Sequence, residues 1–127
     1  MEERPFRFLA AVQDIFFTAK ITAAAKRVGV TVEFLREESK LLESAQSSPS
    51  IVIVDLSDSS RHPIELIAKL KAIPSESGVR IIGYVSHVQS ELIREAQKAG
   101  CDLVLPRSVF SQQLDELLRQ RSCYPIS

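Results

Sequence analysis

The feature that most constrains the fold is a run of four β-branched residues, Ile51-Val52-Ile53-Val54, which leads directly into Asp55. A segment that is apolar at every position is typical of a strand covered on both faces, as the central strand of a parallel sheet is. Asp55 then lies at the carboxyl end of that strand, where ligands bind in open α/β sheets. From this stretch alone, a cap of the following polar loop explains Asp55 equally well.

The size and composition of the chain fit one globular domain. Its 127 residues are 45% hydrophobic and 25% charged, and sixteen basic residues balance sixteen acidic ones. Because binding to a phosphate backbone usually leaves a basic footprint, we expect no nucleic acid as a partner. There is no long apolar segment and no secretory leader, so we expect no membrane association and a cytoplasmic location. Cys101 and Cys123 lack the spacing of a zinc site and are expected to be free thiols.

Strand and helix patterns alternate along the chain. Strands are expected at residues 6–12, 31–35, 50–55, 79–85 and 103–105. This alternation predicts an α/β three-layer sandwich, with a five-stranded parallel sheet of order 2-1-3-4-5 and five helices, which is the flavodoxin-like arrangement.

The helices are predicted from apolar residues at helical spacing and from their end signals. Gly29 should end the first helix, Glu38–Ala45 should form the second, Pro63 should open the third, Gly100 should end the fourth, and Ser111 should cap the fifth. The residues expected to point inward are Phe17, Ile21, Ala24 and Val28, then Ile64, Ile67, Leu70 and Ile73, then Leu92, Ile93 and Ala96, and finally Leu114, Leu117 and Leu118.

With these elements placed, the chain resembles the receiver domain of bacterial response regulators (the CheY-like superfamily) from Phe6 to about Arg121. The resemblance rests on Val52-Ile53-Val54-Asp55, on Glu65-Leu66 ten positions after the acid, and on the turn Ala99-Gly100-Cys101-Asp102. In receivers the aspartate that ends the third strand accepts a phosphoryl group, which makes Asp55 the candidate phosphoacceptor. The resemblance implies one receiver-like domain over residues 1–127, with its core at about 6–121 and a short tail at 122–127.

A carboxylate that attacks a phosphoryl donor faces like-charge repulsion, which Mg²⁺ held by neighbouring acids relieves. Receivers place two acids after the first strand, where this chain has Gln13 and Asp14. The resemblance therefore implies a weak Mg²⁺ site, if any, formed by Asp14, Asp55 and the backbone carbonyl of Ser57. Asp14 is explained equally well as the N-cap of the first helix.

Two positions expected to contact the phosphoryl group depart from the family. Thirty positions after Asp55, where receivers carry Thr or Ser, this chain has Val85, which has no hydroxyl. Ser86 could substitute only if the strand end were shifted, because adjacent strand residues point to opposite faces. Fifty-two positions after Asp55 the family's lysine is Arg107. It is expected to contact the phosphoryl oxygens, with a geometry different from that of an ammonium group.

Two further positions depart from the family. Ser108 stands where receivers have a cis-proline, and Val104 replaces the aromatic residue of the fifth strand, which together with the hydroxyl carries the phosphorylation signal in receivers. We therefore expect an atypical receiver of a two-component phosphorelay. It would lack an output domain, would not be an enzyme, and would act by contact with a sensor kinase or a downstream effector. A homodimer through the last two helices and the fifth strand is what the resemblance suggests.

Other functions remain as alternatives. The first is a phosphorylation-independent pseudo-receiver adaptor, and the second is a small metal-dependent enzyme that uses the same edge of the sheet. His62 and His87, with Asp55 and Asp14, would suit a transition metal, although solvated histidines are the simpler explanation. A Ser86-His87-Asp55 triad is disfavoured, because sequence neighbours diverge and the Gly-x-Ser-x-Gly elbow is absent. No phosphate-binding loop or dinucleotide fingerprint is present.

Overall fold

The computed structural model describes residues 7–74, 78–86 and 89–120. These residues form a parallel sheet of order β2-β1-β3-β4-β5, which confirms the predicted topology. The strands are β1 (Arg7–Ala11), β2 (Val32–Phe34), β3 (Ser50–Asp55), β4 (Val79–Val85) and β5 (Leu103–Pro106). Both ends of the predicted domain, including the tail at 122–127, lie outside the described residues.

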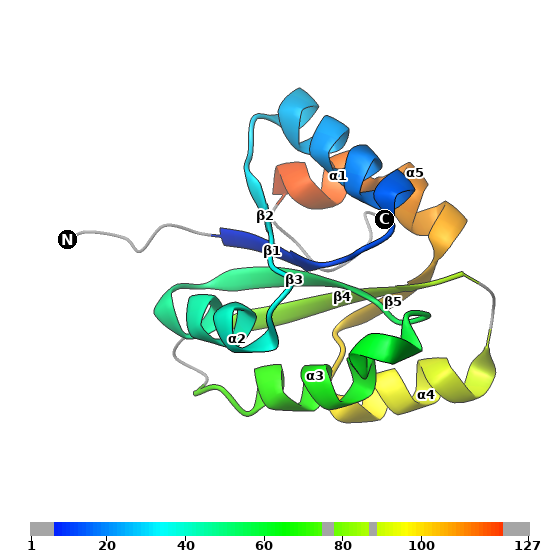
Figure 1. Cartoon of the computed structure of the whole chain (residues 1–127). Coiled ribbons are helices and arrows are strands. Elements are labelled where there is room, and N and C mark those ends of the chain that lie inside the picture. The colour runs from blue at the N-terminus through cyan, green and yellow to red at the C-terminus, as the bar shows by residue number, and fades with distance from the viewer. Residues whose placement is uncertain (1–6, 75–77, 87–88, 121–127) are drawn as a thin grey trace.

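Helices cover both faces of the sheet and give the predicted three layers (Figure 1). On one face lie α1 (Ile15–Val28) and α5 (Arg107–Gln120). On the other lie α2 (Glu38–Ser47), α3 (Pro63–Lys71) and α4 (Ser90–Ala99), and a short 3₁₀ helix, η1 (Ser59–Arg61), leads from β3 into α3. None of the helices in the described ranges is long and apolar enough to cross a membrane.

The central strand β3 separates two hydrophobic cores. Ile51 and Ile53 pack into the core beneath α1 and α5, whereas Val52 and Val54 pack into the core against α2, α3 and α4. All four side chains are at most 1% exposed, so the strand is apolar on both faces because both faces are covered. The alternation continues at the end of the strand, which directs Asp55 toward the α1 and α5 side.

The last helix begins at Arg107, so the prediction of a start near Ser111 is wrong. Phe110 is fully buried and shares the inward face with Leu114, Leu117 and Leu118. The helical repeat therefore starts one turn earlier than the leucines alone suggested. Ser111 lies inside the helix, and its hydroxyl accepts a hydrogen bond from Lys20 Nζ at 3.1 Å. Because β5 ends at Pro106 and α5 begins at Arg107, the start of α5 lies at the carboxyl edge of the sheet.

The inward faces of α3 and α4 also differ in part from the prediction. Ile64 is only half-buried, and Leu66 joins Ile67 and Leu70 in the core. Ile73 is buried but lies beyond the end of α3. In α4 the side chains of Leu92 and Ile93 are half-buried and only Ala96 is fully buried, because α4 lies at the side of the sheet where less of its surface is covered.

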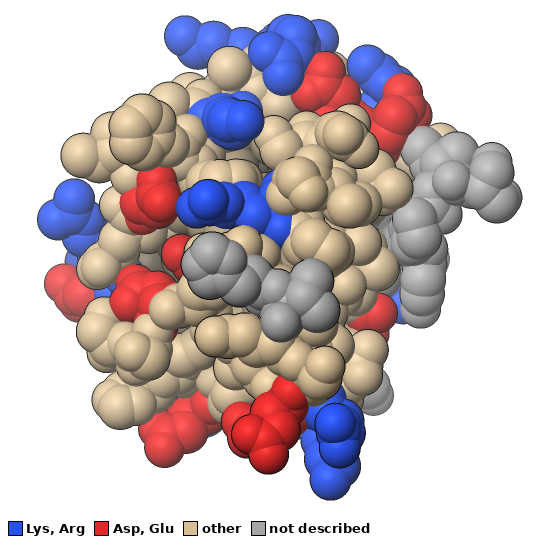
Figure 2. All heavy atoms as spheres, turned by 90° about the vertical axis from the view of Figure 1, so that its right-hand side faces the viewer, with Lys and Arg blue, Asp and Glu red and all other residues tan. Residues whose placement is uncertain are grey.

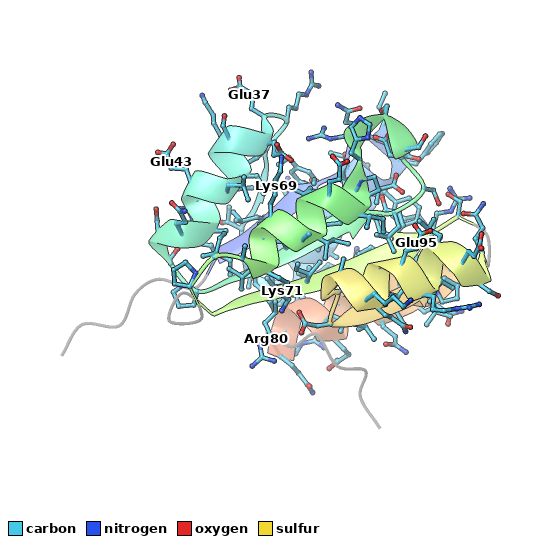
Figure 3. The ribbon with its side chains drawn as sticks, turned by 90° about the horizontal axis from the view of Figure 1, so that it is seen from below. Glu37, Glu43, Lys69, Lys71, Arg80 and Glu95 are labelled. Atoms are coloured by element: carbon cyan, nitrogen blue, oxygen red, sulfur yellow. The ribbon has the colours of Figure 1, made fainter. Side chains whose placement is uncertain are left out.

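The turn that resembles the family's Gly-Ala-Asp has a structural role. Asp102 Oδ2 accepts a hydrogen bond from the backbone N–H of Ile81 at 2.7 Å and lies 2.7 Å from Lys71 Nζ. Gly100 ends α4 with φ of 114°, a conformation that favours glycine. Seen from below, Lys71 lies at the end of α3, and Lys69 lies between α3 and α2, where it pairs with Glu38 at 3.0 Å (Figure 3). Asp102 and Lys71 thus join α3 to the start of β5 and to β4, and Lys69 joins α3 to α2.

A close approach between β3 and β4 positions the loop after Asp55. A Cβ atom on Gly83 would lie 2.7 Å from Leu56 Cδ1 and 3.2 Å from Cys101 Sγ. Leu56 also donates its backbone N–H to the carbonyl of Tyr84 at 2.9 Å. The absent side chain at Gly83 thus lets Leu56 pack against β4.

We predict that Gly83→Ala destabilises the protein by about 1–3 kcal/mol, because the added methyl overpacks the site that Leu56 fills. Leu56→Ala alone should cost about 2–5 kcal/mol through the cavity that it leaves. Urea unfolding of both single variants and the double variant tests the contact. The double variant should lose clearly less than the sum of the two losses, and additive losses would contradict the predicted clash.

Candidate functional site

Asp55 is the last residue of β3 and is half-buried at the carboxyl edge of the sheet. Its Oδ1 accepts the backbone N–H of Ser57 at 3.0 Å, so the carboxylate turns back over its own loop. Asp55 therefore caps the following loop, which is the alternative role that its sequence position also predicted. The cap uses only Oδ1, and the other carboxylate oxygen, Oδ2, takes no part in it. Figure 2 views this side of the molecule, where acidic and basic side chains lie next to one another.

Asp14 follows β1, the neighbour of β3 in the sheet, and caps α1. Its Oδ1 accepts the backbone N–H groups of Phe16 at 2.8 Å and Phe17 at 3.2 Å. The capping alternative for Asp14 is therefore confirmed. A metal-binding role stays a prediction, and the two roles are compatible because the cap uses only one carboxylate oxygen.

The electrostatics of the site disfavour the charge on Asp55. Partial burial raises the pKa of the Asp55 carboxyl, and the negative charges of Asp58 and Asp14 raise it further. The Ser57 N–H and the positive charge of Arg107 oppose this effect. Asp58 was not among the predicted site residues, because a polar loop residue carries no spacing signal. A cation or a proton at this edge would relieve the crowding of negative charge.

The acidic residues of the site provide only as many carboxylate ligands as a Mg²⁺ ion commonly uses in proteins. Mg²⁺ commonly binds proteins through one or two carboxylates together with waters and phosphate oxygens, and Asp14 and Asp55 could supply those two. The predicted third ligand, the carbonyl of Ser57, already accepts the N–H of Ser59 at 3.1 Å. Within the ranges that the structure describes, no three His, Cys, Asp or Glu side chains gather closely enough to hold a metal.

The end of β4 is shifted so that Ser86, and not Val85, follows Tyr84 by two positions on the strand face that carries Asp55. β4 runs through Val85, and Asp55 pairs with Tyr84 in the register between β3 and β4. Val85 is fully buried in the core against α2, α3 and α4, on the face opposite to Asp55. Ser86 follows the strand and donates its backbone N–H to Ser57 Oγ at 2.9 Å. A phosphoryl contact by Ser86 stays a prediction.

Tyr84 is the site residue that the sequence reasoning missed. Its ring is 1% exposed and stacks against Phe17, at 4.7 Å between ring centroids, and against Phe110, at 4.9 Å, while those two rings lie 6.1 Å from each other. Burial raises the pKa of its hydroxyl, and the charges of Asp55 and Asp14 raise it further. Within the described part of the chain, the hydroxyl makes no hydrogen bond of normal geometry. An unpartnered buried hydroxyl costs about 1–3 kcal/mol, so its retention here calls for an explanation.

Arg107 is the first residue of α5, and its guanidinium lies 5.5 Å from the centre of the Phe17 ring. Its positive charge lowers the pKa of Asp55, and this is the smallest of the effects that act on that carboxyl. Lys20 also lies over the Phe17 ring, at 5.7 Å. A pocket of about 340 Å³ opens between the starts of α1 and α5, lined by Asp14, Phe16, Phe17, Lys20, Arg107, Ser108 and Ser111.

The two histidines do not join a described site with Asp55. His62 has a left-handed backbone with φ of 48° and lies between η1 and α3, where it lines two open pockets beside Glu65. His87 lies outside the described residues. In the described ranges, the transition-metal alternative therefore lacks the side chains that it would need.

Comparisons with known proteins agree with the topology. No protein-family model and no curated protein matches the chain. A response regulator from Hahella chejuensis superposes with a TM-score of 0.75 at 16% identity, over 90% of this chain and 92% of that chain. A Burkholderia pseudomallei protein described as pilus assembly-related gives 0.69 at 18% identity, over 91% and 87%.

A third similar structure is a response regulator from Burkholderia pseudomallei that carries a phosphorylated aspartic acid and a calcium ion. It superposes with a TM-score of 0.68 at 19% identity, over 93% of this chain and 74% of that chain. At identities this low, the likeness establishes the fold. The chain has the fold of response-regulator receiver domains, as the resemblance implied.

We predict that Asp55→Asn raises Tm by a few degrees at about pH 7 in a buffer with a metal chelator. Because the pKa of Asp55 is raised in the folded protein, its carboxylate costs stability once the pH exceeds the unfolded-state value of about 4. Asparagine keeps an oxygen for the Ser57 N–H. The gain should shrink toward zero at about pH 3, where the acid is protonated in both states. Thermal unfolding across this range measures the difference.

Asp115→Asn provides a control of opposite sign. The hydrogen bonds from Arg27 lower the pKa of Asp115, so its charge favours the folded state above the unfolded-state pKa. This variant should lose a little stability at neutral pH and none in acid. Equal or lower stability of Asp55→Asn at neutral pH would contradict the assignment of Asp55 as a disfavoured charge.

Proposed function

We propose that the protein is a two-component receiver whose phosphoacceptor is Asp55. The observation that carries the proposal is the position of this half-buried carboxylate. It ends the central strand, has the second acid, Asp14, directly after the neighbouring strand β1, and has its pKa, raised by burial, lowered in part by the positive charge of Arg107. The similarity of the fold to a response regulator with a phosphorylated aspartic acid supports it.

The chemistry required of Asp55 is modest. A carboxylate oxygen forms a bond to phosphorus while the bond from phosphorus to the donor breaks, and the donor leaves with that electron pair. The donor would be a phosphohistidine of a kinase or a small acyl phosphate. Bound Mg²⁺, held by Asp14 and Asp55, would neutralise charge on the phosphoryl oxygens. The guanidinium of Arg107 would bind these oxygens and hold the phosphoryl group at the start of α5.

A pseudo-receiver adaptor remains the second candidate, because Val85 turns its side chain away from Asp55 and is buried in the opposite core. Position 85 therefore offers no hydroxyl to Asp55. A similar fold occurs in a protein named for pilus assembly, so the fold is not limited to proteins named as response regulators. A metal-dependent enzyme has less support, since no group of three metal-ligating side chains gathers in the described ranges.

The surface beside the site favours a protein as the partner. Ile15 and Phe16 are 82% and 79% exposed at the start of α1, immediately after Asp14. Large apolar side chains with this exposure, directly after the candidate metal ligand Asp14, suit the docking of a kinase or phosphotransfer protein. Association of two copies through α4, β5 and α5 belongs to the same proposal, and sedimentation velocity of the purified protein tests it.

The phosphoacceptor is tested by incubation of the protein with Mg²⁺ and a small acyl phosphate, followed by intact-mass measurement. The wild-type protein should gain the mass of one phosphoryl group, in an adduct that hydroxylamine or base removes. Asp55→Asn should gain none, and Asp58→Asn, which alters the neighbouring acid, should still be modified. Asp14→Asn should slow the reaction strongly, by about tenfold or more, because one of two metal ligands is lost.

Two results would reject this proposal. One is an adduct that persists on Asp55→Asn, because the phosphoryl group would then be on another side chain. The other is no adduct on the wild-type protein together with no heat of Mg²⁺ binding, which would favour the adaptor.

The docking surface is tested with the double variant Ile15→Ser/Phe16→Ser and a kinase that phosphorylates the wild-type protein. Transfer from the kinase should slow by about tenfold or more, because the apolar contacts of a docking surface are lost. Modification by the small acyl phosphate should be unchanged, since neither side chain contacts Asp55. An equal loss with both donors would place the effect at the site itself and contradict a docking role.

A further inference from the structure

Tyr84 places a buried hydroxyl among the charged groups of the site. Asp55 and Tyr84 are direct partners in the register of two parallel strands, so their side chains leave the sheet on the same face. In keeping with this placement, the negative charges of Asp55 and Asp14 raise the pKa of the Tyr84 hydroxyl beyond the effect of burial. The Tyr84 ring stacks against Phe17 and Phe110, which also contact each other at 6.1 Å, so the three rings form one cluster that fixes the tyrosine ring.

In the described part of the chain this hydroxyl makes no hydrogen bond of normal geometry, and its hydrogen-bonding interaction with the nearby Asp55 is only the smallest of the effects that raise its pKa. A buried donor that lacks an acceptor gains most from a ligand that brings one, and three phosphoryl oxygens on Asp55 would do so. We propose that the Tyr84 hydroxyl donates a hydrogen bond to the phosphoryl group on Asp55 and thereby supplies the contact that Val85 cannot make. This inference rests on the proposed function, since it requires a phosphoryl group at Asp55.

The position of Tyr84 also defines the surface that would respond. Its ring touches α1 through Phe17 and α5 through Phe110. The same two helices are joined at the surface by two hydrogen bonds from Arg27 to Asp115, at 2.9 and 3.0 Å. A small shift of the Tyr84 ring would therefore act on the seam between α1 and α5. One tyrosine would combine the hydroxyl and the aromatic ring, which Val85 and Val104 do not provide.

The experiment uses Mg²⁺ with beryllium fluoride, which binds a carboxylate as a phosphoryl group does, and measures affinity by calorimetry. Tyr84→Phe removes the hydroxyl and keeps the stacked ring. It should bind beryllium fluoride about tenfold more weakly than the wild type, the loss expected for one hydrogen bond to a charged group. Its Tm without ligand should not fall, because the hydroxyl has no partner there.

Val85→Thr is the matched control, because it introduces a hydroxyl at the family's position on the opposite face. It should bind as the wild type does, and Tyr84→Phe/Val85→Thr should remain as weak as Tyr84→Phe. A direct readout comes from Tyr124→Phe, in which Tyr84 is the only tyrosine of a chain without tryptophan. Binding of beryllium fluoride to this variant should shift the Raman doublet of Tyr84 toward the doublet of a tyrosine whose hydroxyl donates a hydrogen bond.

The outcomes separate this inference from the function on which it rests. Wild-type affinity in Tyr84→Phe, or an unchanged Raman doublet on binding, overturns the role of Tyr84 and leaves Asp55 as the acceptor. Rescue of Tyr84→Phe by Val85→Thr would also overturn it, because the contact would then come from β4's other face. No binding by the wild type, with no phosphoryl adduct, rejects the function itself and the role of Tyr84 with it.

Discussion

The burial of β3 between two hydrophobic cores is the constraint on which the rest of the structure depends. Ile51 and Ile53 belong to the core under α1 and α5, and Val52 and Val54 belong to the core on the opposite face. Because all four side chains are withdrawn from water, the register of the strand is fixed, and a slip by one residue would exchange the two cores. The first polar residue, Asp55, is thereby held at the edge of the sheet and directed toward α1 and α5.

The neighbouring strand makes this position unusual. Val79–Val85 pairs with β3 in a register that sets Tyr84, and not Val85, beside Asp55. The absence of a side chain at Gly83 lets Leu56 pack down on the other face, which holds the loop after the acid close to the sheet. The electrostatic environment of Asp55 therefore combines two acids, one arginine and a phenol, in place of the acids, hydroxyl and lysine that typify receivers.

The sequence predicted what periodicity and burial determine. The strand order, the apolar central strand and the position of Asp55 follow from runs of β-branched residues and from alternation with helices, and they are confirmed. The start of α5 was misplaced because a serine resembles a cap, while Phe110 adds a buried turn before it. The place of Tyr84 in the site was not predicted, because a tyrosine inside an apolar strand is typical of a core residue. Its significance depends on the register between β3 and β4, which the sequence does not encode locally.

That register also changes how the departures from the family are understood. In sequence, Val85 and Val104 look like two independent losses, which together remove the switch. In three dimensions, Tyr84 packs against both Phe17 and Phe110, so that the phenol on the face of the acid and the ring against α1 and α5 belong to one side chain. A signal that begins at Asp55 would then reach the α1 and α5 seam through one cluster of three aromatic rings. It would not require a rotating residue on β5, where this chain has Val104.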